Sequence, residues 1–326
     1  MKTLVILNPK AGGALDDPGV RGQLAALPDT VVRETTAAGH AERLAREAID
    51  QGFERVVAAG GDGTMNEVLN GLAPDFSCAC LGVLPVGTGN DFVRSIGVPD
   101  DVEAALEVLR RDRRMAVDVA RAVSADRTRY FLNMSAGGFS KEVDAALDPE
   151  VKARWGALSY FRSAAQALPE LTAYQARVTV DDEVLEVSLF AMVVANARYV
   201  ASGIKAAPSA RLDDGRLDVL IFPEMPVGRL AMLVPRALLG LHEGSDQVIV
   251  RRAREVEVAS EPPITFNVDG ELMGDEPIRF TLFPRALQMV VGRLEQEDED
   301  AAAATADGEI GGQAEDQADD EGEGVG

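Results

Sequence analysis

The sequence of 326 residues contains only two cysteines, Cys78 and Cys80, and no hydrophobic run that approaches the roughly 20 residues of a membrane-spanning helix. Two cysteines that lie two positions apart in an expected strand are not expected to form a disulfide or a metal clip. We interpret both as reduced, buried, structural thiols of a cytoplasmic protein. The short apolar run at residues 3–7 leads directly into a Pro/Gly turn. This pattern indicates a buried first strand rather than a signal peptide.

Lysine is also scarce, with five residues against 27 arginines, and the net charge is −22. The segment from Arg293 to the end holds 13 acidic residues and one basic residue, so just over half of the net charge lies there. A chain this acidic repels nucleic acid, and we expect no nucleic-acid partner. Few lysines and many acidic residues are typical of proteins that work at high salt, although a GC-rich genome and an acidic tail give the same composition.

The first 121 residues alternate strand-like and helix-like segments. The expected strands cover residues 3–9, 30–36, 54–61 and 78–87, and the expected helices cover residues 20–28, 40–52, 64–73, 90–97 and 101–111. Apolar strands separated by amphipathic helices predict an α/β domain with a parallel sheet covered on both faces. Ligands of such sheets bind at the carboxyl ends of the strands.

From residue 122 to residue 292, Val-rich segments with alternating polar and apolar residues predict an antiparallel β-sandwich. The expected strands cover residues 128–139, 173–182, 183–197, 215–222, 247–253, 255–260, 264–271, 277–283 and 286–292, with helices at 155–168 and 227–241. After Gly292 the chain is mainly Ala, Asp, Glu and Gly, which predicts a disordered acidic tail over residues 293–326. The predicted domains are therefore residues 1–121 and 122–292, followed by the tail.

Three glycine-rich turns each follow an expected strand of the first domain. They are NPKAGG at residues 8–13, GGDGT at 60–64 and PVGTGND at 85–91. Glycines let the backbone approach a ligand, and helix N-termini present free N–H groups to phosphate. One such loop is weak support because glycine is common in turns, but three at one edge of a parallel sheet predict a phosphate site. The sequence has no Gly-Lys-Ser/Thr P-loop, which excludes a Walker-type cradle.

The segments NPKAGG, GGDGTMNEV, PVGTGNDFVRSIG and, far downstream, FNVDGE resemble the soluble diacylglycerol kinase family, which includes bacterial lipid kinases and sphingosine kinases. The resemblance covers residues 1–292 in order and spacing. It implies a nucleotide-binding α/β domain, a β-sandwich domain and an active site between them. It also implies transfer of the γ-phosphoryl group of ATP to a lipid hydroxyl, such as that of diacylglycerol, with Mg²⁺, as a step of phospholipid biosynthesis.

The resemblance implies a set of nucleotide contacts from the three turns and from a threonine that precedes a Gly-His-Ala segment. On this sequence they are Asn8, Pro9, Lys10, Ala11, Gly12, Thr35, Gly61, Asp62, Gly63, Thr64, Met65, Asn66, Glu67 and Thr88. We expect the Asp62 carboxylate to be catalytic and nearest the phosphates and the metal ion. Asp91 is expected to support the third turn, and Asp118 to close the site from the last strand.

The resemblance places the proton acceptor at Glu271, in a turn that also offers Asp269. In the bacterial members a second acidic turn carries a structural Mg²⁺, and the matching contacts are Arg211, Asp214 and Arg216. The two arginines would act through backbone carbonyls, since a guanidinium group cannot bind a cation. A type I turn without a metal ion is the alternative.

Two other functions remain open at this point: an NAD kinase or another small-molecule kinase with a GGDG motif, and a non-catalytic nucleotide-binding regulator. The pair Asn66-Glu67 directly after GGDGT favours a lipid kinase, and the presence of Asp62, Asp91 and Glu271 together favours catalysis. Residues 196–208 depart from the family pattern, which leaves the identity of the lipid open. We expect a cytoplasmic protein, peripheral at the membrane and without a transmembrane segment, whose partner is a lipid substrate at the membrane surface. We also consider a homodimer.

Overall fold

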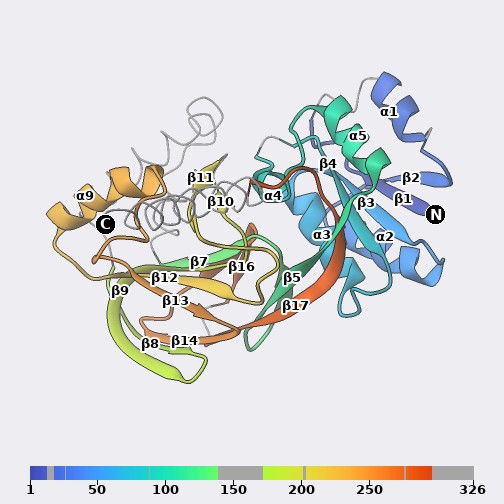
Figure 1. Cartoon of the computed structure of the whole chain (residues 1–326). Helices are drawn as coiled ribbons and strands as arrows, with labels where there is room; N and C mark the ends of the chain where they lie inside the picture. The colour runs from blue at the N-terminus through green and yellow to red at the C-terminus, as the bar shows by residue number, and fades with distance from the viewer. Residues whose placement is uncertain are drawn as a thin grey trace, which may run out of the picture. The chain divides into compact units, whose positions relative to one another are not determined.

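The structure is a computed structural model that describes residues 1–12, 18–25, 27–87, 89–138, 172–200, 203–274 and 277–295 (Figure 1). The chain divides into two units, Met1–Gly292 and Arg293–Gly326. Only residues 293–295 of the second unit are described, so the predicted tail lies outside the described residues, as does the predicted helix at 155–168. Within the described ranges, no helix is long and apolar enough to cross a membrane.

Parallel strands form the first part of the larger unit. They are β1 (Thr3–Leu7), β2 (Thr30–Glu34), β3 (Arg55–Gly60) and β4 (Cys80–Pro85), in the order β2-β1-β3-β4. Every residue of β1, β3 and β4 is buried. This burial explains why these strands are continuously apolar in the sequence, since both faces of the sheet are covered.

The helices of this part are α1 (Pro18–Ala25), α2 (His40–Asp50), α3 (Asp62–Leu72), α4 (Asp91–Ser95) and α5 (Val102–Arg111). Helices α1 and α5 pack together on one face of the sheet, and α2 and α3 pack together on the other (Figure 1). Helix α2 buries Ala41, Leu44, Ala45 and Ala48. Their spacing of three or four residues places them on one stripe of the helix, which faces the core.

An antiparallel arrangement of strands forms the second part. Its elements are β5 (Arg114–Val123), β6 (Thr128–Phe131), β7 (Met134–Gly138), β8 (Tyr174–Val180), β9 (Glu183–Ala195), β10 (Tyr199–Val200), β11 (Ile204–Lys205), β12 (Leu217–Pro223), α9 (Val227–Leu238), β13 (Ile249–Ala253), β14 (Glu255–Glu261), β15 (Phe266–Val268), β16 (Glu271–Met273) and β17 (Ile278–Val290). Buried and more exposed residues alternate along β8. The predicted fold class, a parallel α/β part followed by an antiparallel β-sandwich-like part, is confirmed.

Strand β17 connects the two parts. It pairs antiparallel with β14 and β5, and it is the neighbour of β4 in the sheet, where Met289 lies opposite Leu81 in a parallel pair. Residues 278–290 therefore complete the sheet of the first part from the end of the second. The predicted division after residue 121 falls inside β5, and a domain boundary there remains a prediction.

The interpretation of both cysteines as buried is wrong for Cys78. Cys80 is buried at the start of β4, and this burial raises the pKa of its thiol to about 11. Cys78 is exposed because it lies in the turn before β4 rather than in the strand. The two thiols are therefore in different environments.

Candidate active site

The first and second glycine turns and part of the third line one pocket at the carboxyl edge of the parallel strands. This pocket has a volume of about 320 Å³ and is lined by Asn8, Lys10, Ala11, Gly12, Gly61, Gly63, Thr64 and Gly87. Lys10 is the one charged side chain among the residues that line it. A cation surrounded by glycine backbone at the start of helix α3 suits an anionic ligand such as a phosphate group.

The glycines are required because the three turns pack backbone against backbone. A Cβ atom on Gly12 would lie 2.3 Å from the carbonyl oxygen of Val86, and the φ angle of Gly12 is +139°. A Cβ atom on Gly87 would lie 2.5 Å from the Cα atom of Gly61. Side chains at these positions would push the turns apart and change the shape of the pocket.

Asn8 ties the first turn to the second. Its Nδ2 donates to the Thr64 hydroxyl over 3.1 Å, and its Oδ1 accepts from the backbone N–H of Lys10 over 3.0 Å. The same residues border a second pocket of about 280 Å³, which is lined by Asn8, Lys10, Thr35, Thr36, Ala37, Ala38, Ala41, Gly63, Thr64 and Glu67. The two adjoining pockets thus bring together nine of the predicted nucleotide contacts.

Glu67 caps helix α2 from a neighbouring helix. Residue Gly39 at the N-terminus of α2 offers no side-chain cap, and the Glu67 carboxylate accepts from the backbone N–H groups of Gly39 (2.9 Å) and Ala41 (3.0 Å). A carboxylate in this position satisfies free N–H groups and interacts favourably with the helix dipole. Glu67 therefore shapes the wall of the second pocket.

The remaining predicted nucleotide contacts have other surroundings. Met65 and Asn66 are buried, and the Asn66 side chain donates to the carbonyl of Tyr130 over 3.2 Å. Pro9 lies in the first turn but does not line either pocket. Thr88 lies outside the described residues. Contacts of these residues with a nucleotide remain predictions.

Asp62 connects the second turn to the third. Its carboxylate accepts from the backbone N–H groups of Asp91 (3.1 Å) and Phe92 (3.3 Å), which begin helix α4. The Asp91 carboxylate in turn accepts from the backbone N–H of Gly203 over 3.3 Å. In this arrangement Asp62 anchors α4 and is not among the residues that line either pocket, although its neighbours Gly61 and Gly63 are. A direct role of Asp62 at the phosphates remains a prediction.

The hairpin β15–β16 brings the acids of the second part towards the turn that contains Asp62. Asp269 accepts from the backbone N–H groups of Leu132, Asn133 and Met134 over 2.9–3.2 Å. Desolvation raises the pKa of Asp269 to about 6, although these three hydrogen bonds lower it. The negative charge of Asp62 also raises the pKa of Asp269. Asp269 and Asp62 therefore lie within electrostatic reach of each other.

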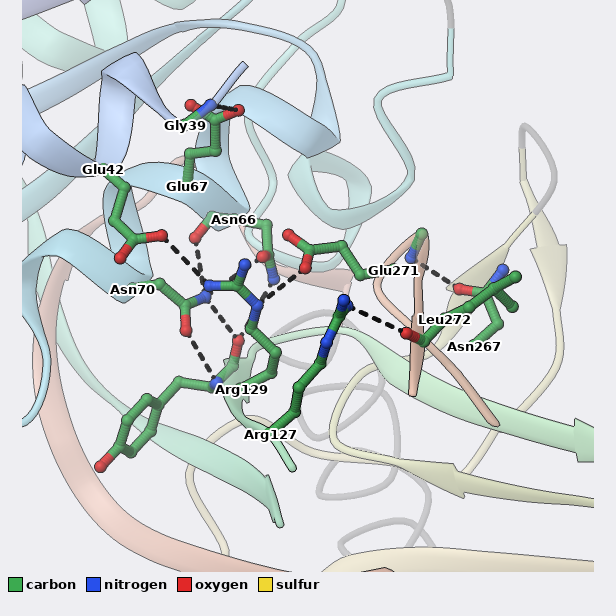
Figure 2. Close-up of polar contacts among 12 residues, drawn as sticks. Gly39, Glu42, Asn66, Glu67, Asn70, Arg127, Arg129, Asn267, Glu271 and Leu272 are labelled. Carbon is green, nitrogen blue, oxygen red and sulfur yellow. Dashed lines mark hydrogen bonds and ion pairs between the residues drawn. The ribbon is translucent and has the colours of Figure 1, made fainter. Parts of the chain in front are cut away.

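Glu271 lies at the start of β16 and is about one-third exposed. Its Oε2 pairs with Nε of Arg129 over 2.7 Å, and Nη1 of Arg129 donates to Glu42 of helix α2 over 3.1 Å (Figure 2). Sequence reasoning missed Arg129 and Glu42, because neither belongs to a motif and they lie 87 positions apart.

The predicted metal turn is held together by arginine. Asp214 accepts from the backbone N–H of Arg216 over 3.0 Å, and its other oxygen pairs with the guanidinium group of Arg252. Within the described residues, no group of three or more His, Cys, Asp or Glu side chains is placed to hold a metal ion. The predicted site uses one carboxylate and two backbone carbonyls, so that finding does not test it.

Acidic neighbours of this turn bear on whether it suits a cation. Oδ1 of Asp213 is buried without a hydrogen-bond partner, and Nε of Arg211 lies 3.6 Å from it. Desolvation raises the pKa of buried Asp118, and the charges of Asp214 and Asp213 raise it further. The negative charge of this turn therefore suits a cation. To bind one, Asp214 would have to release its ion pair with Arg252.

The expectation that Asp118 closes the phosphate site is wrong. The carboxylate of Asp118 accepts from the backbone N–H groups of Gly215 and Arg285, each over 2.7 Å. It is fully buried and committed to the acidic turn and to β17. Its role in the structure is to join these two segments.

These features define an α/β protein with a pocket at the edge of its parallel sheet whose lining suits an anionic ligand, and with Asp269 of the β15–β16 hairpin within electrostatic reach of Asp62. Residues 2–122 match the family model of the diacylglycerol kinase catalytic domain, and residues 134–291 match the YegS C-terminal NAD kinase beta sandwich-like domain. The chain therefore belongs to the diacylglycerol kinase family of lipid kinases, as the sequence motifs indicated.

Individual relatives agree with this assignment. A YegS-like protein of Pseudomonas aeruginosa (strain UCBPP-PA14), named as a lipid kinase, is 36% identical over 88% of this chain and 93% of its own length. The diacylglycerol kinase of Bacillus subtilis (strain 168) is 31% identical over 83% of this chain and 89% of its own length. The crystal structure of a diacylglycerol kinase from Bacillus anthracis str. Sterne has a TM-score of 0.76 at 26% identity and covers 89% of this chain and 97% of that chain.

Proposed function

We propose that this protein is an ATP-dependent kinase that transfers the γ-phosphoryl group to the hydroxyl group of a lipid such as diacylglycerol, at the membrane surface. The observation that carries the proposal is the pocket in which Lys10 is surrounded by the three glycine turns. Phosphoryl transfer depends mainly on positioning and charge stabilisation, and this pocket offers both to an anionic ligand.

The nucleotide is held by the first part of the chain. Lys10 supplies a positive charge for the phosphates, and backbone N–H groups at the start of helix α3 donate to their oxygens. The second pocket, between Thr35 and Glu67, accepts the remainder of the nucleotide. Its size, about 280 Å³, is close to the lower end of typical ligand pockets, at ~300 Å³.

Glu271 is the base that accepts the proton of the lipid hydroxyl. The hydroxyl oxygen bonds to the γ-phosphorus, the bond from that phosphorus to the bridging oxygen breaks, and the electron pair leaves with ADP. Asp269 has the raised pKa, but both of its oxygens accept backbone N–H groups and hold the hairpin. Glu271 is partly exposed and is therefore the better placed carboxylate.

Mg²⁺ would neutralise the charge of the transferred phosphoryl group when it is bound. On this chain Asp62 is the carboxylate closest to that role, and a second, structural Mg²⁺ is proposed at Asp214 with the backbone carbonyls of Arg211 and Arg216. Asp62 then has two functions, since it also holds the start of helix α4.

The proposal is tested by incubating the protein with labelled ATP and Mg²⁺ and offering diacylglycerol in vesicles, a total lipid extract, or NAD as acceptor, at low and high salt. Transfer of label to diacylglycerol is the expected result. Label in NAD alone would overturn the lipid assignment, and no transfer to any acceptor at either salt concentration would overturn the kinase assignment.

The variant Glu271→Gln tests whether Glu271 acts as the base without contributing to nucleotide binding. The variant should lose about 10²–10⁴-fold in transfer rate, the range that general base catalysis supplies. Its affinity for a non-hydrolysable ATP analogue, measured by titration calorimetry, should be unchanged because the proposed nucleotide contacts lie in the first part of the chain. Loss of nucleotide binding together with turnover would contradict the assignment of Glu271 as the base.

A further inference from the structure

Arg129 lies between two carboxylates that come from different parts of the chain. Its Nε atom is 2.7 Å from Oε2 of Glu271 on β16, and its Nη1 atom is 3.1 Å from Oε2 of Glu42 on α2 (Figure 2). All three side chains are between about one-quarter and one-third exposed. A guanidinium group can make both contacts at once because it presents several N–H donors in a fixed plane.

We propose that Arg129 is the positioning residue of Glu271, which it holds in a fixed orientation relative to the nucleotide-binding helices. The inference rests on the proposed function, since it assumes that Glu271 is the base. Glu271 is at the start of a three-residue strand in a short hairpin, so its side chain needs an external contact to be held in one orientation.

The backbone that carries Arg129 is itself fixed by helix α3. Asn70 donates to the carbonyl of Tyr130 over 2.9 Å and accepts from the Tyr130 N–H over 3.0 Å. Asn66, one turn earlier on α3, donates to the same carbonyl over 3.2 Å. Two buried side chains of the helix that begins in the GGDGT turn therefore hold the residue next to Arg129.

The other end of the ion pair is also tied to the nucleotide site. Glu42 lies in the first turn of α2, and the start of that helix is capped by Glu67 of α3. A continuous set of contacts thus runs from Glu67 through α2 to Glu42, Arg129 and Glu271 (Figure 2). A displacement of the nucleotide pocket would reach the base through these contacts.

A neighbouring arginine supports the same hairpin in a different way. Nη1 of Arg127 donates to the backbone carbonyl of Leu272 over 3.3 Å, so it contacts the backbone of the strand and not the Glu271 side chain. Arg127 fixes the position of the hairpin, whereas Arg129 fixes the orientation of the carboxylate. Without Arg129, no cation would bridge the carboxylates of Glu42 and Glu271, although Glu42 would keep its pair with Arg46 at 2.9 Å.

The test compares Arg129→Gln, Arg129→Lys and Glu42→Gln with wild type in the lipid transfer assay. Arg129→Gln should lower kcat about tenfold and leave the KM for ATP within about twofold, because only the orientation of the base changes. Arg129→Lys keeps the charge but cannot span both carboxylates, so kcat should recover to about threefold below wild type. Glu42→Gln should lower kcat about twofold.

A matched control is available in Arg279→Gln. Arg279 pairs with Glu257 over 2.5 Å in an ion pair on β17 and β14, and it contacts none of the residues described above. This variant should retain wild-type kcat. Partly exposed ion pairs contribute about 0–1 kcal/mol, so all four variants should melt within about 4 °C of wild type.

A double-mutant cycle with Glu271→Gln decides the outcome. In that background Arg129→Gln should cause no further loss, since the carboxylate that it positions is gone. If the two losses multiply, or if Arg129→Gln and Arg129→Lys keep wild-type kcat while Glu271→Gln does not, the positioning role is wrong and the base assignment stands. If Glu271→Gln itself keeps wild-type kcat, the proposed base is wrong and the inference falls with it.

Discussion

Replacing Glu67 by alanine tests whether one carboxylate fixes the start of helix α2. The helix begins after Gly39, which has no side chain to cap it, and Glu67 supplies the missing acceptors from α3. Removing the carboxylate leaves the N–H groups of Gly39 and Ala41 without this partner. Ala41 and Glu67 are both among the residues that line the second pocket, so the cap also borders that pocket.

The size of the effect follows from the two hydrogen bonds. A side-chain N-cap contributes about 0.5–2 kcal/mol, and a hydrogen bond to a charged group contributes about 1.5–3 kcal/mol. Because Glu67 is partly exposed, water can replace part of this interaction, and we expect a loss of about 2 kcal/mol for Glu67→Ala. In a domain of this size such a loss lowers Tm by about 4–8 °C. Glu67→Gln retains one acceptor oxygen and should lose about half as much.

The assay is thermal unfolding followed by circular dichroism, with the KM for ATP measured on the same samples. Glu47→Ala is the matched control, because Glu47 lies on α2 and, among the described residues, its carboxylate makes long ion pairs with Arg33 (3.6 Å) and Arg43 (3.8 Å) instead of a helix cap. Its Tm should stay within about 2 °C of wild type. An unchanged Tm for Glu67→Ala would refute the cap, and an unchanged Tm with a raised KM would assign Glu67 to direct nucleotide contact instead.

Two further predictions concern Asp269 and Gly12. Desolvation raises the pKa of Asp269 from 3.8 to about 6, so its contribution to stability is full below pH 3.8 and is lost as the pH rises through 6. The free energy of unfolding in urea should fall between pH 4.5 and pH 7.5 by about 2 kcal/mol more in wild type than in Asp269→Asn. An equal fall in the two proteins would contradict the argument. Gly12→Ala should raise the KM for ATP about tenfold, because its Cβ would meet the Val86 carbonyl, whereas Gly22→Ala, in open space on α1, should not.

The sequence predicted the parallel part of the fold well because its signals are local. Strands β1, β3 and β4 are buried on both faces and read as continuous apolar runs, and each is followed by its glycine turn. The pocket could therefore be predicted from residues that are close in sequence. The sequence also predicted that Asp269 and Glu271 lie together at one turn, because both belong to one short motif, and the turn between β15 and β16 contains Asp269, while Glu271 begins β16.

The contacts between distant segments could not be predicted. Glu67 caps a helix that starts 26–28 positions earlier, and Arg129 bridges residues that no motif links to it. Two separate strands were expected at 277–283 and 286–292. The structure has the single strand β17 instead. This strand is irregular between the two expected segments, with a register shift between Phe283 and Leu287 and a positive φ of 49° at Arg285.

The place of β17 also determines the order in which the chain can fold during synthesis. Strand β5 ends at Val123 and β17 begins at Ile278, so the ribosome needs roughly 10–30 s to add the intervening residues at ~5–20 residues per second. Throughout this interval β4 has an open edge that a strand of another nascent chain could occupy. The nucleotide-binding part, although it is made first, can complete its sheet only after the β-sandwich has been synthesised.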